Sequence, residues 1–137
     1  MQTIQGSSKE TRVLVVEDHA DTAESLRLLL AGCGFHVTVA HTSQEGLETA
    51  RKLEPDIVLC DIGLPDSDGY TVGSVLRQSS ATAGARLIAV TGFGEPHDRR
   101  RALAAGFDQH LVKPVDPDAL EELLRAYTKR SDGGAEA

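Results

Sequence analysis

Short, uninterrupted apolar runs constrain the fold of this chain more than any other feature. Residues 13–16, 57–60 and 87–90 are all apolar and are rich in β-branched side chains. A strand covered on both faces shows such a run, whereas a strand with one wet face alternates apolar and polar residues. Parallel sheets are covered on both faces because their crossover helices pack there. The runs therefore predict a parallel sheet between two layers of helices.

Helical patterns and helix-start signals follow the predicted strands. Thr42 and Glu45 have the spacing of a capping box. Asp116 is an N-cap before Pro117, which suits the first helical position. We predict strands at 12–16, 35–40, 57–61, 87–90 and 110–112, and helices at 20–31, 42–53, 69–79, 95–105 and 116–127. This order predicts an α/β fold with a doubly wound, five-stranded parallel sheet and right-handed crossovers.

Length, charge and cysteine usage narrow the class of protein. A chain of 137 residues fits one domain, which we expect at 12–127, with a flexible leader at 1–11 and a flexible tail at 128–137. No apolar run reaches the roughly 18 residues of a membrane span. The net charge of −7 argues against direct binding of nucleic acid. Two cysteines without metal-ligand neighbours fit a reducing compartment, so we expect a cytoplasmic protein.

Polar side chains stand at the ends of four predicted strands. Glu17 and Asp18 follow the first strand, Asp61 ends the third, Thr91 follows the fourth and Lys113 follows the fifth. In doubly wound sheets, ligands bind outside the carboxyl ends of the strands, where the strand order reverses. With the order 2-1-3-4-5, that point lies between the first and third strands. The five side chains should therefore converge there.

The converging residue types suit phosphoryl transfer. Three neighbouring carboxylates repel one another unless a cation joins them, and an incomplete set of oxygen ligands suits Mg²⁺. Lys113 adds a positive charge that can meet Asp61 and then a phosphoryl oxygen, and Thr91 offers a hydroxyl donor. We therefore predict Asp61 as a carboxylate nucleophile, with Lys113 and Thr91 as its catalytic partners.

Four motifs resemble those of the receiver domain of two-component response regulators. They are the acidic pair in 15–18, the acceptor loop in 59–69, the hydroxyl motif in 89–92 and the lysine motif in 111–114. The resemblance covers about residues 11–127 and implies a flavodoxin-like (βα)5 fold. It also implies that Asp61 takes a phosphoryl group from a phosphohistidine on a histidine kinase or a histidine phosphotransfer protein.

Further assignments rest on this resemblance alone. Mg²⁺, or Mn²⁺ as a substitute, would be held by Asp18, Asp61 and the carbonyl of Gly63, with Glu17 acting largely through water. The Lys113-Pro114 peptide bond would be cis. The domain would promote its own phosphorylation and dephosphorylation, would turn over no external substrate, and would be a monomer or weak dimer.

The resemblance also implies a conformational switch. Phosphorylation of Asp61 would draw the Thr91 hydroxyl inward and shift the face built from the last two helices and the strand between them. In its shifted form this face would bind a downstream protein. His110 stands where the family usually carries Tyr or Phe, so the aromatic part of the switch would fall to a smaller ring whose charge varies with pH.

Two other classes of function share parts of this pattern. A phosphatase of the haloacid dehalogenase type uses a similar set of carboxylates, hydroxyl, lysine and Mg²⁺, but its acceptor motif lies on the first strand. A flavin-binding module of the same fold would place a phosphate loop after the first strand, where Glu17 and Asp18 would repel a phosphate. The phosphatase is the alternative function.

Several interpretations stay open at this stage. The chain is either a stand-alone receiver or the receiver of a hybrid sensor kinase. His19 either touches the acidic site or is solvated, and the arginine run at 99–101 either contacts a partner or forms a solvated face. Asp66 and Asp68 are expected to be turn and helix-cap residues, not additional ligands.

Overall fold

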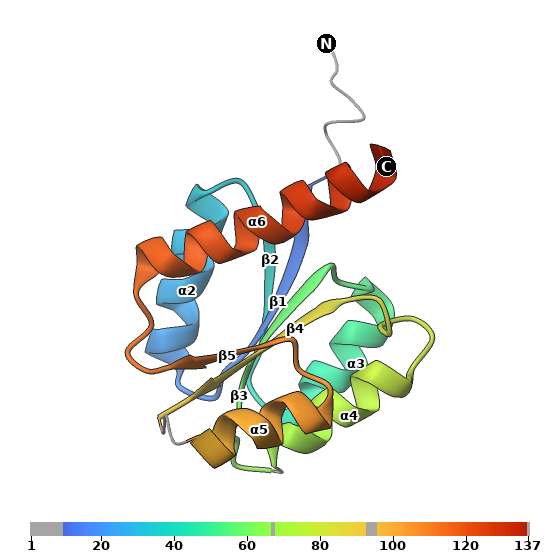
Figure 1. Cartoon of the computed structure of the whole chain (residues 1–137). Helices are drawn as coiled ribbons and strands as arrows, with labels where there is room; N and C mark the ends of the chain where they lie inside the picture. Colours follow the sequence, from blue (N-terminus) through green and yellow to red (C-terminus); the bar gives the residue numbers. More distant parts are fainter. Residues whose placement is uncertain (1–9, 67, 93–95, 137) are drawn as a thin grey trace.

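The computed structural model describes residues 10–66, 68–92 and 96–136. Its five parallel strands form one sheet in the order β2-β1-β3-β4-β5, which confirms the predicted fold and strand order (Figure 1). The strands are β1 (Arg12–Val16), β2 (His36–Ala40), β3 (Ile57–Asp61), β4 (Arg86–Thr91) and β5 (Gln109–Val112). The helices are α2 (Ala20–Gly32), α3 (Ser43–Leu53), α4 (Gly69–Gln78), α5 (Pro96–Ala105) and α6 (Pro117–Glu136).

The last helix is the element that differs most from its predicted bounds. α6 continues to Glu136, past the expected end near Tyr127. The sequence after Tyr127 contains no proline, and its glycines lower helix propensity without removing a backbone donor. The flexibility expected for residues 128–137 stays a prediction. Most of the expected leader, residues 1–9, lies outside the described residues, as does Glu95, where the fourth helix was expected to begin.

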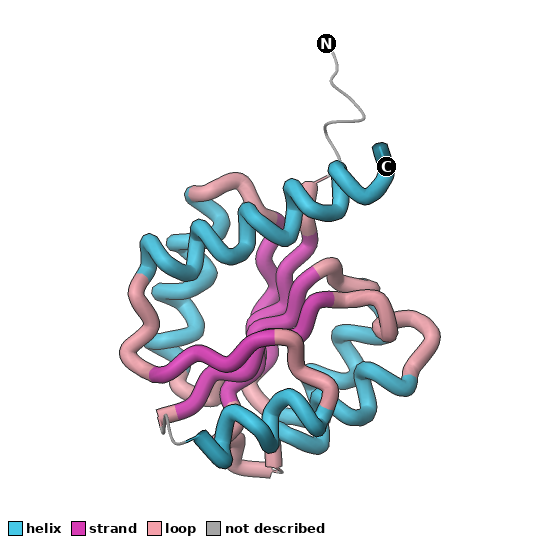
Figure 2. The backbone as a smooth tube through the Cα atoms, viewed as in Figure 1, coloured by secondary structure: helices cyan, strands magenta, loops and turns pink. Residues whose placement is uncertain are grey.

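The helices cover the sheet in two layers, as the apolar runs predict. α2 and α6 lie on one side of the sheet and α3, α4 and α5 on the other (Figures 1 and 2). Successive β1 side chains enter opposite layers: Val15 packs in the cluster of Leu124 from α6, and Leu14 packs in the cluster of Leu76 from α4. Within the described part of the chain, no helix is long and apolar enough to cross a membrane.

Gly73 stands in the interior of α4 for a packing reason. A Cβ atom at this position would lie 2.5 Å from the ring of Phe107, well inside the contact distance of two carbon atoms. Phe107 follows α5 and is buried in the core. The glycine that weakens the helix by propensity therefore lets this ring pack directly on the α4 backbone.

Arg77 connects the two loops that lead into β4 and β5. Its guanidinium donates hydrogen bonds to the carbonyl oxygens of Ala83 (2.7 Å), Ala85 (2.9 Å) and Gly106 (2.6 Å). It also forms an ion pair with Asp108 at 2.9 Å. These contacts lie at the amino ends of β4 and β5, whereas the predicted site lies at the carboxyl ends of the strands. Arg77 therefore fixes the two strands in place without contacting the predicted site.

Candidate functional site

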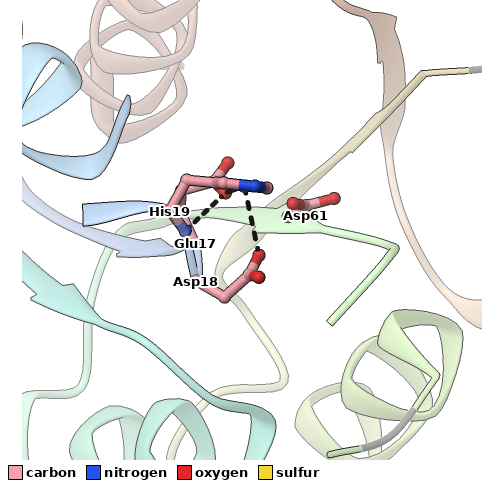
Figure 3. Close-up of side chains that lie close together, drawn as sticks. All are labelled: Glu17, Asp18, His19 and Asp61. Atoms are coloured by element: carbon pink, nitrogen blue, oxygen red, sulfur yellow. Dashed lines mark hydrogen bonds and ion pairs between the residues drawn. The ribbon is translucent and has the colours of Figure 1, made fainter. Parts of the chain in front are cut away.

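The predicted site residues meet at the carboxyl edge of the sheet. β1 pairs with β3, β3 with β4 and β4 with β5, all in parallel, so their carboxyl ends lie side by side. Asp61 is the last residue of β3 and Thr91 the last of β4, whereas Glu17 and Asp18 follow β1 and Lys113 follows β5. The close-up view shows the three acids close together (Figure 3). The predicted convergence is therefore present in the structure.

Lys113 joins two buried carboxylates of this cluster. Its Nζ lies 3.0 Å from Oδ2 of Asp61 and 3.5 Å from Oε1 of Glu17. The residues Asp61 and Glu17 are 6% and 3% exposed. A buried carboxylate is costly unless a cation or donor satisfies it, so the amine stabilises both charges at once.

The same contacts shift two pKa values in the cluster. Burial raises the pKa of Glu17; the backbone N–H of His19 lowers it and the charge of Asp61 raises it, and the outcome lies above the ordinary value. Partial burial lowers the pKa of Lys113, but the hydrogen bond and charge of Asp61, with those of Glu17, outweigh it and raise this pKa. Lys113 therefore stays cationic at neutral pH.

The acids also fit a divalent cation. Single ligand atoms of Glu17, Asp18, His19 and Asp61 all lie within 4.8 Å of one another. Oδ1 of Asp18 is buried and has no hydrogen-bond partner among the described residues. A carboxylate oxygen in that condition needs a cation or a donor, and carboxylate oxygens are ligands that Mg²⁺ prefers. The residues present therefore suit Mg²⁺ at this position.

His19 touches the acidic cluster from its solvent side. Nδ1 of its ring lies 3.2 Å from Oε2 of Glu17 and 3.6 Å from Oδ1 of Asp18. The imidazole is nevertheless 72% exposed. Both readings left open by the sequence thus hold in part: the ring is solvated, and it contacts the two acids that follow β1.

The loop after β3 carries a hydrogen-bond donor for Asp61, the predicted acceptor. The backbone N–H of Gly63 donates to Oδ1 of Asp61 at 3.0 Å. Leu64, the next residue, is buried in the core cluster that also contains Val16 from β1. With Lys113 on Oδ2, both oxygens of Asp61 have a donor in this structure.

Asp68 is a helix cap, as predicted, whereas Asp66, expected to be a turn residue, also caps a different helix. Asp68 is the N-cap of α4 and accepts a hydrogen bond from the N–H of Tyr70 at 2.8 Å. Asp66 instead accepts from the N–H groups of Ser43 (2.8 Å) and Gln44 (3.0 Å), the first two residues of α3. Sequence reasoning missed this second contact because the partners are distant along the chain.

The β4 and β5 ends position the hydroxyl and the amine. The N–H of Lys113 donates to the carbonyl oxygen of Thr91 at 2.8 Å, and Thr91 is buried. The Lys113-Pro114 peptide bond is cis, the form that the resemblance implies. The two predicted catalytic partners of Asp61 are thus joined through their backbones.

His110 lies on β5, paired in register with Ala89 of β4. Its Nε2 is buried and has no hydrogen-bond partner among the described residues. Burial lowers the pKa of the imidazole; Asp98 raises it and Arg99 lowers it further. The ring is therefore neutral at pH 7, as an apolar aromatic residue would be.

Arg101 connects α5 to the acceptor loop, a contact that the arginine run alone did not reveal. Its guanidinium forms an ion pair with Asp68 at 2.8 Å and stacks over the ring of Tyr70 at 4.2 Å from the centroid. At least one member of the run therefore serves an intramolecular contact. Helix α5 belongs to the face that the resemblance implies for output.

Comparison with known proteins identifies the family. The model of the response regulator receiver domain family matches residues 13–125. An uncharacterized 14.6 kDa protein from Leptolyngbya boryana is 35% identical over 115 residues, covering 84% of this chain and 88% of that protein. The cell cycle response regulator CtrA of Brucella ovis is 32% identical over 126 residues and 92% of this chain. The chain spans only 53% of that regulator's length.

Solved structures show the same fold. A CheY-like response regulator receiver domain protein from Methanospirillum hungatei JF-1 superposes with a TM-score of 0.82 at 28% identity, covering 91% of this chain and 99% of that one. The signal receiver domain of a signal transduction histidine kinase from Syntrophus aciditrophicus gives 0.78 at 25% identity, covering 85% and 89%. These matches give no support to the phosphatase alternative.

Proposed function

Because this chain belongs to the response regulator receiver domain family, we propose that it is a phosphorylatable switch whose acceptor is Asp61. The phosphoryl donor would be a phosphohistidine on a histidine kinase or a histidine phosphotransfer protein. The observation that carries this proposal is the contact between Lys113 and Asp61, 3.0 Å apart within a buried group of acids. That arrangement holds a nucleophilic carboxylate beside a cation able to follow the charge as it moves onto phosphorus.

The proposed reaction is an in-line substitution at phosphorus. A carboxylate oxygen of Asp61 forms the new bond, while the bond from phosphorus to the donor imidazole breaks and leaves its electron pair on nitrogen. Lys113 exchanges a carboxylate oxygen for a phosphoryl oxygen, and the Thr91 hydroxyl donates to another. Positioning and charge neutralisation provide most of the rate in such transfers.

Mg²⁺, with Mn²⁺ as a substitute, is the proposed cofactor. Asp18, Asp61 and the carbonyl of Gly63 would hold it, and Glu17 would act largely through water. When bound, the ion would neutralise charge on the transferring phosphoryl group. Oδ1 of Asp18, which is buried and accepts no hydrogen bond from the described residues, supports this assignment.

The proposed output surface is the face of α5, β5 and α6. Phosphorylated Asp61 would recruit Thr91, and the shift would pass to α5 and to His110 on β5. Arg101 would carry part of this coupling, since it joins α5 to the loop that follows Asp61. Leu103 of α5 and Val112 of β5 are 50% and 42% exposed, which suits contact with a downstream protein.

The biological setting is proposed in general terms. The chain would work in the cytoplasm as a monomer or weak dimer, without direct contact to nucleic acid. It would promote its own phosphorylation and dephosphorylation without an external turnover substrate. Both the stand-alone receiver and the receiver of a hybrid kinase remain proposals, and the second is supported by the structural likeness to a histidine kinase receiver.

Incubation with acetyl phosphate and Mg²⁺ tests the proposal. The wild type should gain the mass of one phosphoryl group, which alkaline hydroxylamine should release. Asp61→Asn should gain none, whereas Asp56→Asn, at the other end of β3, should label like the wild type. Stoichiometric labelling of Asp61→Asn would refute the acceptor assignment, and rapid phosphate release without any accumulation of phosphorylated protein would favour the phosphatase.

A further inference from the structure

Asp66 bridges two parts of the molecule that are far apart in sequence. It lies in the loop between Asp61 and α4, yet both of its carboxylate oxygens accept hydrogen bonds from the first turn of α3. Oδ1 is 2.8 Å from the N–H of Ser43, and Oδ2 is 3.0 Å from the N–H of Gln44. These N–H groups have no partner within the helix, and a negative charge is favoured at a helix N-terminus.

The carboxylate of Asp66 attaches the exposed part of this loop to a different element, α3. Gly63, Pro65 and Asp66 are all exposed, and Leu64 is the buried residue between them. The hydrogen bonds from the N–H of Gly63 to Asp61 and from the N–H of Gly69 to Ile62 stay within the segment after β3. The two hydrogen bonds of Asp66 instead restrain the loop relative to α3.

The far side of the bridge leads to the acids that follow β1. His41, just before α3, places Nδ1 3.1 Å from the carbonyl oxygen of Glu17, the distance of a hydrogen bond donated by the ring. The N–H of Glu17 in turn donates to the carbonyl of Ala40 at 2.9 Å. The start of α3 is thus attached to the Glu17 backbone, and Asp66 attaches the Asp61 loop to the start of α3.

We propose that Asp66 is a positioning residue for phosphoryl acceptance by Asp61. Through α3, it fixes the loop that contains Gly63 relative to the acids that follow β1, so that the two halves of the site keep their separation. The proposal rests on the function proposed above. It predicts a loss of cation affinity and of phosphorylation rate beyond any loss of stability.

The test compares Asp66→Ala, Asp66→Asn and Thr42→Ala with the wild type. Thr42 caps the same helix, because its hydroxyl accepts a hydrogen bond from the N–H of Glu45 at 3.1 Å, and among the described residues its side chain forms no hydrogen bond to the acceptor loop. Calorimetric titration gives the Kd for Mg²⁺, thermal unfolding gives Tm, and acetyl phosphate gives the phosphorylation rate constant.

We expect both alanine variants to lower Tm by about 3–5 °C through the lost cap. Substituting a residue that hydrogen-bonds directly to a metal ligand typically weakens metal binding by roughly 10- to 100-fold. Asp66 acts on the ligands only through the intervening loop, so Asp66→Ala should weaken Mg²⁺ binding less, by about three- to tenfold. The phosphorylation rate constant at fixed Mg²⁺ should fall in proportion. Asp66→Asn keeps one acceptor oxygen but turns an NH2 donor toward the second N–H group, so it should recover only part of the affinity, and Thr42→Ala should bind Mg²⁺ like the wild type.

If both Asp66→Ala and Thr42→Ala bind Mg²⁺ as tightly as the wild type, the proposal is overturned and Asp66 is only a helix cap. If both variants lose affinity to the same extent, the proposal is also overturned, because the loss would then come from the weakened start of α3. Failure of the wild type itself to bind Mg²⁺ or to accept a phosphoryl group would instead refute the proposed function. The two failures are therefore distinguishable within one series of variants.

Discussion

Removing the charge of Asp18 should stabilise this protein when no divalent cation is present. Ligand atoms of Asp18, Glu17 and Asp61 lie within 4.8 Å of one another, and Oδ1 of Asp18 has no hydrogen-bond partner among the described residues. At 4.8 Å, two like charges repel by ~3.5 kcal/mol at an effective dielectric constant of 20 and by ~1 kcal/mol in water. The Asp18 side chain is 27% exposed, so the lower part of this range applies. We expect Asp18→Asn to raise the free energy of unfolding by ~1 kcal/mol.

Thermal and urea unfolding in chelator at low ionic strength measure this effect, since salt would screen it. An increase of ~1 kcal/mol corresponds to a rise in Tm of about 3–5 °C for a chain of this size. Asp21→Asn is the matched control because it makes the same change in net charge at the first turn of α2. There the acid interacts favourably with the helix dipole, so its removal should lower stability slightly.

Adding Mg²⁺ should reverse the order of the two proteins. A ligand that binds only the folded state stabilises it by RT ln(1 + [L]/Kd), which the wild type should gain and Asp18→Asn should largely lose. If Asp18→Asn is less stable than the wild type in chelator, the acids do not repel one another as argued. If Mg²⁺ stabilises both proteins equally, Asp18 does not help to bind the cation.

Three further changes have expected outcomes. Lys113→Ala should leave acetyl phosphate labelling possible but uncouple it from the output face, so amide NMR shifts should stay near the acceptor; shifts spreading to α5 as in the wild type would contradict this. Gly73→Ala should cost about 2–3 kcal/mol in urea unfolding because its Cβ meets Phe107 at 2.5 Å, whereas Gly84→Ala, with open space around its Cβ, should be near neutral. Burial raises the pKa of Glu17, so the stability of the wild type relative to Glu17→Gln should fall as pH rises from 4.5 through that raised pKa; a constant difference across that range would show that the pKa is unshifted.

The pH prediction follows from proton binding. The folded state holds the Glu17 proton more tightly than the unfolded state, so protonation favours folding below the ordinary pKa of 4.5. As pH rises through the higher folded-state pKa, Glu17 loses its proton in the folded state. The contribution of protonation to the free energy of unfolding is then lost, and the folded state carries a buried charge. Glutamine keeps the side-chain shape without titrating, so it isolates this contribution.

Local pattern alone determined the sheet and the position of the acids along the chain. Continuous apolar runs predicted strands covered on both faces, and the acids, hydroxyl and amine that end them had to meet once those strands ran parallel. The capping box was equally local: the hydroxyl of Thr42 accepts the N–H of Glu45, and Glu45 reaches back to the N–H of His41 at 2.7 Å. The strands and the capping box depend on residues close together in sequence, so residue periodicity and spacing are sufficient to predict them.

Tertiary packing decided the contacts whose partners are distant in sequence. Asp66 looked like a turn residue, and only the docking of its loop on α3 made it a cap for that helix. Gly73 counted against a helix until Phe107 was placed on it, and Arg101 was one arginine among three until α5 lay beside α4. Such contacts depend on how whole helices and loops pack against one another. Residue periodicity and spacing within one segment do not predict which distant residue will be in contact with it.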